Sequence, residues 1–104
     1  MKMIEAIEYI IKEHPDYTQK RVQEVLNAII LFQSEPLALL ITGFDPEKSS
    51  IEESCFFLET NQDMLKLCEE NPGTAISLDT VEYVFNQAHG VTSRDIKDAL
   101  SHPI

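Results

Sequence analysis

The hydrophobic pattern of the N-terminal third predicts two amphipathic helices. Apolar residues recur at helical spacing over residues 3–14, and this helix should end before Pro15, because proline disfavours helical geometry in the residue that precedes it. A second apolar stripe covers residues 22–32. It follows a predicted capping box that begins at Asp16, and it should end before Pro36. Two helices joined so closely are expected to form an antiparallel hairpin.

Three short apolar runs after this hairpin have the pattern of buried strands. Residues 37–44 and 54–60 are bounded by turn residues, and as strands they would direct apolar side chains to both faces of a sheet. Residues 74–78 are a third, weaker run. A two-stranded hairpin is not stable alone in water, so helices must cover it. We therefore predict an α+β fold in a single domain, residues 1–104, with an N-terminal helical hairpin, a small two- or three-stranded sheet and C-terminal helices.

An all-helical bundle is the alternative fold. Leucine and alanine fill much of residues 37–44, and both are good helix formers, so this segment could instead be helical. A further helix is predicted in either fold after Asn61, a residue suited to capping a helix N-terminus. It should stop at Asn71-Pro72-Gly73, which is a strong turn signal.

Two more capping boxes predict the C-terminal helices. Asp79 and Glu82 have the spacing of one box, and Thr92 and Asp95 have the spacing of the other, with Gly90 as the turn between the two helices. This order of helix, turn and helix is compatible with a helical hairpin that packs on the sheet. It is also compatible with a helix-turn-helix.

Residues 81–100 therefore allow an alternative function, a DNA-binding transcriptional regulator of the helix-turn-helix type. Arg94 and Lys97 could contact phosphates, but Asp95 and Asp98 on the same short helix cancel their charge. We favour the packed hairpin and expect no binding to nucleic acid.

Acidic residues are concentrated in the middle of the chain. The sequence has 18 Asp and Glu against 8 Lys and Arg, a net charge of −10, and residues 35–82 hold eleven acidic and two basic side chains, net −9. Such a field opposes nucleic acid and anionic lipid. We expect a non-enzymatic protein-interaction module, such as an inhibitor, an immunity-type protein or a regulatory factor, that presents its acidic middle to a basic protein partner. The residues predicted to contact this partner are Asp45, Glu47, Glu52, Glu53 and Glu59.

Candidate catalytic and metal-binding residues have simpler structural explanations. The three histidines each lie at a predicted helix C-terminus, where the helix dipole favours a cation: His14, His89 and His102. Cys55 and Cys68 fall in apolar segments, which suits small core residues better than reactive thiols. The loop that begins at Asp45 fails as an EF-hand, because Ser50 and Phe56 occupy the positions that need Gly and Glu. We expect no enzymatic activity, no cofactor and no metal site.

The sequence shows no pattern of secretion or membrane insertion. Its apolar runs are shorter than the ~20 residues of a membrane span, and Glu5 and Glu8 fall where a signal peptide would be apolar. Two cysteines do not make a disulfide framework. We expect a cytoplasmic protein without membrane contacts. Because the two-sided strands could exceed what short helices can cover, the sequence also allows a homodimer.

Overall fold

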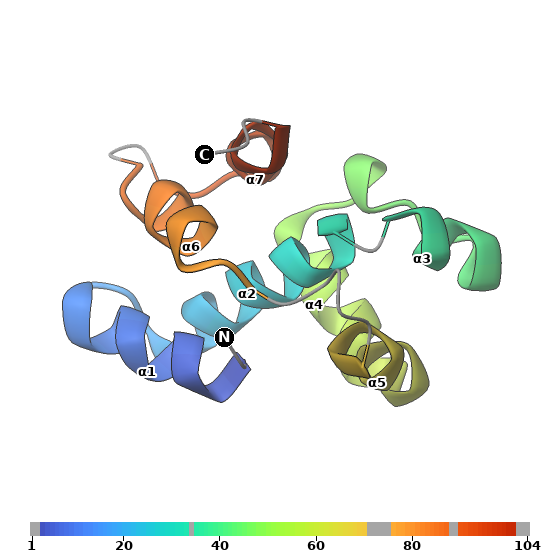
Figure 1. The fold of residues 1–104 in the computed structure, drawn as a ribbon, viewed down its shortest axis with the longest axis horizontal. Helices are drawn as coiled ribbons and strands as arrows, with labels where there is room; N and C mark the ends of the chain where they lie inside the picture. Colours follow the sequence, from blue (N-terminus) through green and yellow to red (C-terminus); the bar gives the residue numbers. More distant parts are fainter. Residues whose placement is uncertain (1–2, 34, 71–75, 88–89, 102–104) are drawn as a thin grey trace.

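The structure, a computed structural model, describes residues 3–33, 35–70, 76–87 and 90–101. Within these ranges every regular element is a helix, and no strand occurs (Figure 1). In chain order the helices are α1 (Met3–Glu13), α2 (Gln19–Gln33), α3 (Glu35–Thr42), the short 3-10 helix η1 (Pro46–Lys48), α4 (Ile51–Thr60), α5 (Gln62–Glu70), α6 (Leu78–Phe85) and α7 (Ser93–Ser101).

The predicted α+β fold is therefore wrong. Residues 37–42 of the first expected strand belong to α3, and residues 54–60 of the second lie inside α4. A short apolar run does not by itself distinguish a buried strand from a helix. The sequence also carries a helix start at Ser50, whose hydroxyl accepts a hydrogen bond from the Glu53 backbone N–H at 3.0 Å. The Glu53 carboxylate in turn accepts one from the Ser50 N–H, and this capping box starts α4 ahead of residue 54, in agreement with the all-helical alternative.

The third expected strand, residues 74–78, is also wrong where the structure describes it. Residues 76 and 77 form no strand, and Leu78 begins α6. Residues 74 and 75 lie outside the described part of the chain. The short apolar run is explained by Ile76, which is buried in the core just ahead of a helix.

Helix α2 is the centre of the fold (Figure 1). It packs against α1, α3, α4, α7 and η1. All residues from Val25 to Leu31 are buried, so over about two turns α2 is covered around its whole circumference rather than along one stripe. The one polar residue in this run is Asn27, whose Nδ2 donates to the Cys55 Sγ on α4 at 3.3 Å. This contact satisfies part of the buried amide.

Helices α1 and α6 are joined through aromatic side chains. The Tyr9 hydroxyl of α1 donates a hydrogen bond to the Glu82 carboxylate of α6. This bond, with burial and the negative charges of Glu82 and Glu13, raises the pKa of Tyr9 to about 12. Tyr17, in the turn after α1, meets the Phe85 ring edge to face, with 5.2 Å between the ring centroids.

The hydrogen bond from Tyr9 also shows why the capping box predicted at Asp79 and Glu82 is wrong. Helix α6 begins at Leu78, so Asp79 lies inside its first turn, and Glu82 is engaged by α1. The box predicted from Asp16 is wrong as well, since α2 begins three residues later. There the Thr18 hydroxyl accepts a hydrogen bond from the Arg21 N–H at 3.1 Å.

The capping box predicted for the last helix is confirmed. The Thr92 backbone N–H donates to Asp95 Oδ2 at 2.8 Å, and the Asp95 N–H donates to the Thr92 hydroxyl at 3.3 Å. Gly90, the predicted turn residue, has φ 86, a left-handed conformation that glycine adopts without strain. It does not follow α6 directly, because that helix already ends at Phe85.

We predict that Leu26→Ala destabilises the protein by about 2–5 kcal/mol, because Leu26 is fully buried at the centre of the core. Chemical denaturation followed by circular dichroism measures the loss. Gln23→Ala, an exposed position on the same helix, is the control and should change stability by less than about 0.5 kcal/mol. Equal effects of the two substitutions would contradict a central position of α2.

Candidate functional site

Helix α3 exposes apolar side chains that the core does not use. Leu39, Leu40 and Ile41 are exposed, with 84% of Leu40 and 54% of Ile41 open to solvent. Three consecutive residues are spread widely around a helix, since successive positions turn by about 100°. No described side chain of α3 belongs to the buried core. The helix lies at the edge of the molecule, on the right in Figure 1.

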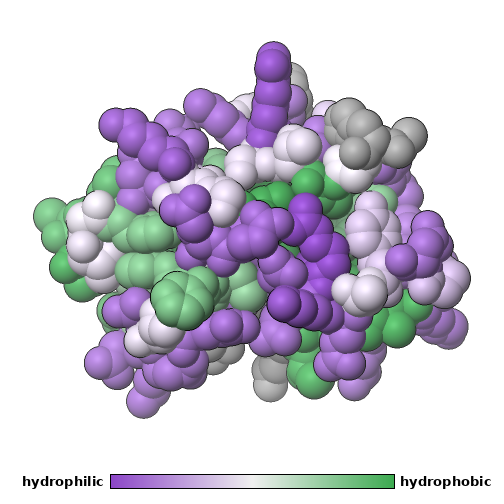
Figure 2. Space-filling view, turned by 180° about the vertical axis from the view of Figure 1, so that it is seen from behind, coloured by the Kyte–Doolittle hydropathy of each residue, from purple (hydrophilic) through white to green (hydrophobic). Residues whose placement is uncertain are grey.

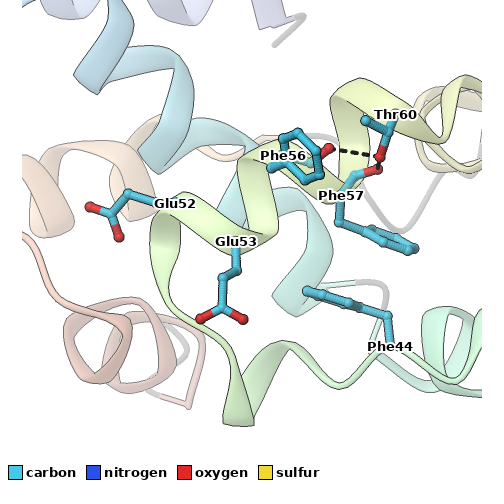
Figure 3. Close-up of a pocket in the computed structure, with 6 residues that line it drawn as sticks. All are labelled: Phe44, Glu52, Glu53, Phe56, Phe57 and Thr60. Atoms are coloured by element: carbon cyan, nitrogen blue, oxygen red, sulfur yellow. Dashed lines mark hydrogen bonds between the residues drawn. The ribbon is translucent and has the colours of Figure 1, made fainter.

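A shallow pocket lies along α4 next to the segment that follows α3. The rings of Phe44 and Phe57 stack with centroids 4.2 Å apart and planes 12° from parallel (Figure 3). Phe56 lines the same pocket, and 65% of its surface is exposed to solvent. The pocket has a volume of about 420 Å³, and its lining residues are Phe44, Glu52, Glu53, Phe56, Phe57 and Thr60.

The pocket lies on the side of the molecule that carries α3, because its lining residue Phe44 follows the end of that helix by two positions. Seen from behind, hydrophobic surface gathers on this side, on the left in Figure 2, with hydrophilic residues around it. We call this surface, made of the pocket residues and Leu39, Leu40 and Ile41, the α3–α4 face. Exposed hydrophobic patches of this kind mark interaction sites more often than isolated apolar residues do.

Two of the five carboxylates predicted to bind a partner are paired with cations of the same chain. Glu47 lies 3.1 Å from the Lys97 Nζ of α7, and Glu52 lies 2.8 Å from the Arg21 Nη1 of α2. Hydrogen bonding to the Glu52 backbone N–H is the largest cause that lowers the pKa of Glu52. Arg21 lowers it further, and partial burial opposes the shift. These two carboxylates contribute less to an acidic surface than the sequence suggests.

Arg21 connects more than one element. Besides Glu52 on α4, its guanidinium donates to the Val91 carbonyl at 3.1 Å, in the segment that leads into α7. It also lies 3.9 Å from Glu24 on its own helix. The sequence gives no signal of this role of Arg21. Glu52 and Val91 are 31 and 70 positions away from Arg21, so no local pattern could have revealed these two contacts.

The other three predicted carboxylates make contacts without a cation among the described ion pairs. Asp45 Oδ1 accepts a hydrogen bond from the Glu47 N–H at 3.0 Å and caps η1. Glu53 closes the capping box of α4, and Glu59 lies 3.5 Å from the Cys55 Sγ. The described cations therefore do not neutralise their negative charge, and of these three carboxylates only Glu53 lines the pocket. In Figure 3 the side chain of Glu52 extends away from the stacked rings.

Cys55 is a buried core residue between α2 and α4. Its sulfur accepts from Asn27 and faces Glu59. Burial is the main cause that raises the pKa of the Cys55 thiol, and Glu59 raises it further, while the Asn27 hydrogen bond opposes them. A raised pKa leaves little thiolate, which disfavours a nucleophile. The side chain of Cys68 lies outside the described part of the chain.

One of the two basic residues on the helix pair of the alternative DNA-binding hypothesis is already paired with a carboxylate. Arg94 and Lys97 of α7 border a polar groove of about 460 Å³ together with Phe32, Glu47, Ser93 and Asp98. Lys97 is held by Glu47, and Asp98 shares the groove with Arg94. Phosphate contacts need basic groups that are not already compensated.

The described residues contain no metal-binding group of three or more His, Cys, Asp or Glu side chains. His14 follows the end of α1, as predicted, and lies against Tyr17 and Phe85. The helix ends predicted at His89 and His102 lie outside the described residues. Among the described helices, none is both long enough and apolar enough to cross a lipid bilayer.

Comparisons with models of protein families, with curated proteins and with solved structures found no match to this chain. The function is therefore inferred from the geometry and the charge of the α3–α4 face.

We predict that Phe57→Ala costs about 1–3 kcal/mol of folding stability, less than the ~3–5 kcal/mol of a fully buried phenylalanine, because Phe57 is only partly buried and stacks on Phe44. Phe56→Ala, one position away and mostly exposed, should cost less than about 0.5 kcal/mol. Urea titrations of the two variants measure the difference. A larger loss of folding stability for Phe56→Ala than for Phe57→Ala would contradict the burial described for the two rings.

We predict that the Cys55 thiol, studied with Cys68→Ser, reacts with iodoacetamide at mildly alkaline pH at least ~10-fold more slowly in the folded protein than in urea, because burial and Glu59 disfavour the thiolate. Glu59→Gln should raise the rate in the folded protein, since it removes a negative charge beside the sulfur. Equal rates in the folded and unfolded chains would contradict a buried thiol.

Proposed function

We propose that this chain is a non-enzymatic protein-interaction module that binds a basic protein through the α3–α4 face. The observation that carries the proposal is the exposure of Leu39, Leu40 and Ile41 beside a pocket of phenylalanines and glutamates. A small monomer gains stability when it buries such side chains, at about 25 cal/mol per Å² of apolar surface. In α3 this gain is unused within the chain and is available to a partner.

The charge of the surface supports a basic partner. The residues from 35 to 82 are net −9, and they include α3, α4 and the pocket between them. Glu53 in the pocket and Asp45 and Glu59 nearby in sequence have no cation among the described ion pairs. Lysine and arginine side chains of a partner would compensate them, and the long-range field would speed the encounter.

The partner can be sought by capture from cell extract and mass spectrometry, followed by reconstitution with the purified candidate. We predict that Glu53→Lys combined with Glu59→Lys weakens the reconstituted complex by at least about 10-fold near physiological salt, since close charge pairs at an interface contribute more than a kilocalorie per mole. The control is Glu5→Lys combined with Glu8→Lys on exposed positions of α1, which changes the net charge equally. Equal weakening by both pairs would contradict a specific face.

We also predict that random duplex DNA at ~0.15 M salt shows no binding into the micromolar range. The reason is that Lys97, one of the two basic side chains of α7, is already paired with Glu47 and cannot contact phosphates freely. Fluorescence anisotropy of labelled DNA measures the binding. Saturable binding that disappears in Arg94→Ala would move the function to transcriptional regulation.

A further inference from the structure

The pocket on the α3–α4 face follows α4 along its length. Glu52, Glu53, Phe56, Phe57 and Thr60 are spaced as neighbours on one side of a helix, and all of them line the pocket. From the first to the last, this side is about 12 Å long, at 1.5 Å per residue. The binding surface is therefore elongated, and its length matches about two turns of a second helix laid beside α4.

This surface consists of side chains, and within the described residues it has no edge of a β-sheet. Within the described ranges the chain has no strand, and the backbone N–H and C=O groups of α4 are engaged within the helix and its caps. An extended peptide could not pair there as an added strand, and its backbone N–H and C=O groups would lose hydrogen bonds to water without forming new ones to the protein. A helix satisfies its backbone internally and presents only side chains, so it fits an apolar surface built from helices.

Charge and apolar groups are separated along the surface. The carboxylates of Glu52 and Glu53 lie in the first turn of α4, and the phenylalanines follow in the next turn. Glu52 already has Arg21, so Glu53 is the carboxylate left for an incoming cation. A ligand that matches this order has apolar side chains at positions i and i+3 or i+4 and a lysine or arginine toward the end that meets Glu53.

A second copy of this chain fits the surface less well. Two copies would bring together chains that each carry a net charge of −10. Like charges at a desolvated contact oppose association. The expectation of a homodimer also loses its original reason, because the two-sided strands on which it was based do not form.

We propose that the occupant of the α3–α4 face is a cationic amphipathic helix of the partner, packed along α4 with its apolar stripe over Phe56 and Phe57 and a basic residue at Glu53. This proposal rests on the proposed function and specifies it. The stack of Phe44 on Phe57 forms the floor. Phe56, which the fold leaves exposed, is the principal anchor for the ligand.

The test uses a set of fluorescent peptides that contain leucine, lysine and arginine in fixed proportion. In half of them leucine recurs with helical spacing, and in the other half the same residues are scrambled. Anisotropy near physiological salt should show binding of amphipathic peptides at least about 10-fold tighter than that of their scrambled counterparts. Amide chemical shifts of the bound protein should change mainly within residues 52–60.

Two variants of the protein identify the contact. Phe56→Ala should weaken the amphipathic peptides by at least about 10-fold, a size typical of a buried aromatic anchor, without affecting the fold. Tyr83→Ala, an exposed aromatic position on α6, is the matched control and should leave binding unchanged. Glu53→Gln should reduce affinity and flatten its dependence on salt.

The outcomes separate this proposal from the function on which it rests. If scrambled and amphipathic peptides bind equally and Phe56→Ala has no effect, the helical ligand is overturned, while binding of a basic partner stands. If no peptide binds but the reconstituted partner still depends on Glu53 and Glu59, the helical ligand is likewise overturned. If the protein is a dimer by light scattering and Phe56→Ala makes it a monomer, a second copy occupies the face and the proposal fails.

Discussion

The burial of α2 on all sides is the constraint on which the rest of the structure depends. A helix whose residues are apolar around the whole circumference cannot lie at a surface, so other elements must surround it. Helices α1, α4 and α7 do so from different directions, and their own apolar stripes are satisfied by the same core. Arg21 adds a polar tie at one end of α2, joining it to α4 and to the segment before α7. The inner helix thus positions α1, α4 and α7, while α5 packs on α4 and α6 packs on α1 and α7.

Local signals in the sequence predicted some of the helix ends but not the class of the fold. The end of α1 before Pro15 and the box of Thr92 and Asp95 are local, and both agree with the structure. The apolar runs at 37–44 and 54–60 could not be assigned in the same way, because burial on two sides looks alike in a strand and in an inner helix. The one pattern that could have decided, Ser50 with Glu53 ahead of the second run, is an ordinary capping box. In the expected α+β fold these two residues fall in the loop between the first two strands.

The candidate site was predicted in part, and the missing part is tertiary. Charge counting located the acidic middle of the chain but not the partners that Glu47 and Glu52 find on α7 and α2. It also gave no indication of an aromatic surface, since Phe44 and Phe57 are thirteen positions apart and meet only after α4 has folded. Both carboxylates and phenylalanines thus serve two purposes here. Glu53 caps its helix and faces the pocket, and Phe57 packs on the core and lines the same pocket.

The position of α3 outside the core has a thermodynamic consequence. An isolated helix of eight residues is marginal in water, because few hydrogen bonds repay its nucleation. With no described side chain in the core, α3 gains little from the cooperative unit that α2 organises, so its opening free energy lies below that of global unfolding. The amide hydrogens of α3 should exchange with solvent through local opening, whereas those of α2 should exchange only when the whole domain unfolds. A ligand that covers Leu40 and Ile41 would stabilise α3 directly, and slowed exchange of the α3 amides would then report that the ligand is bound.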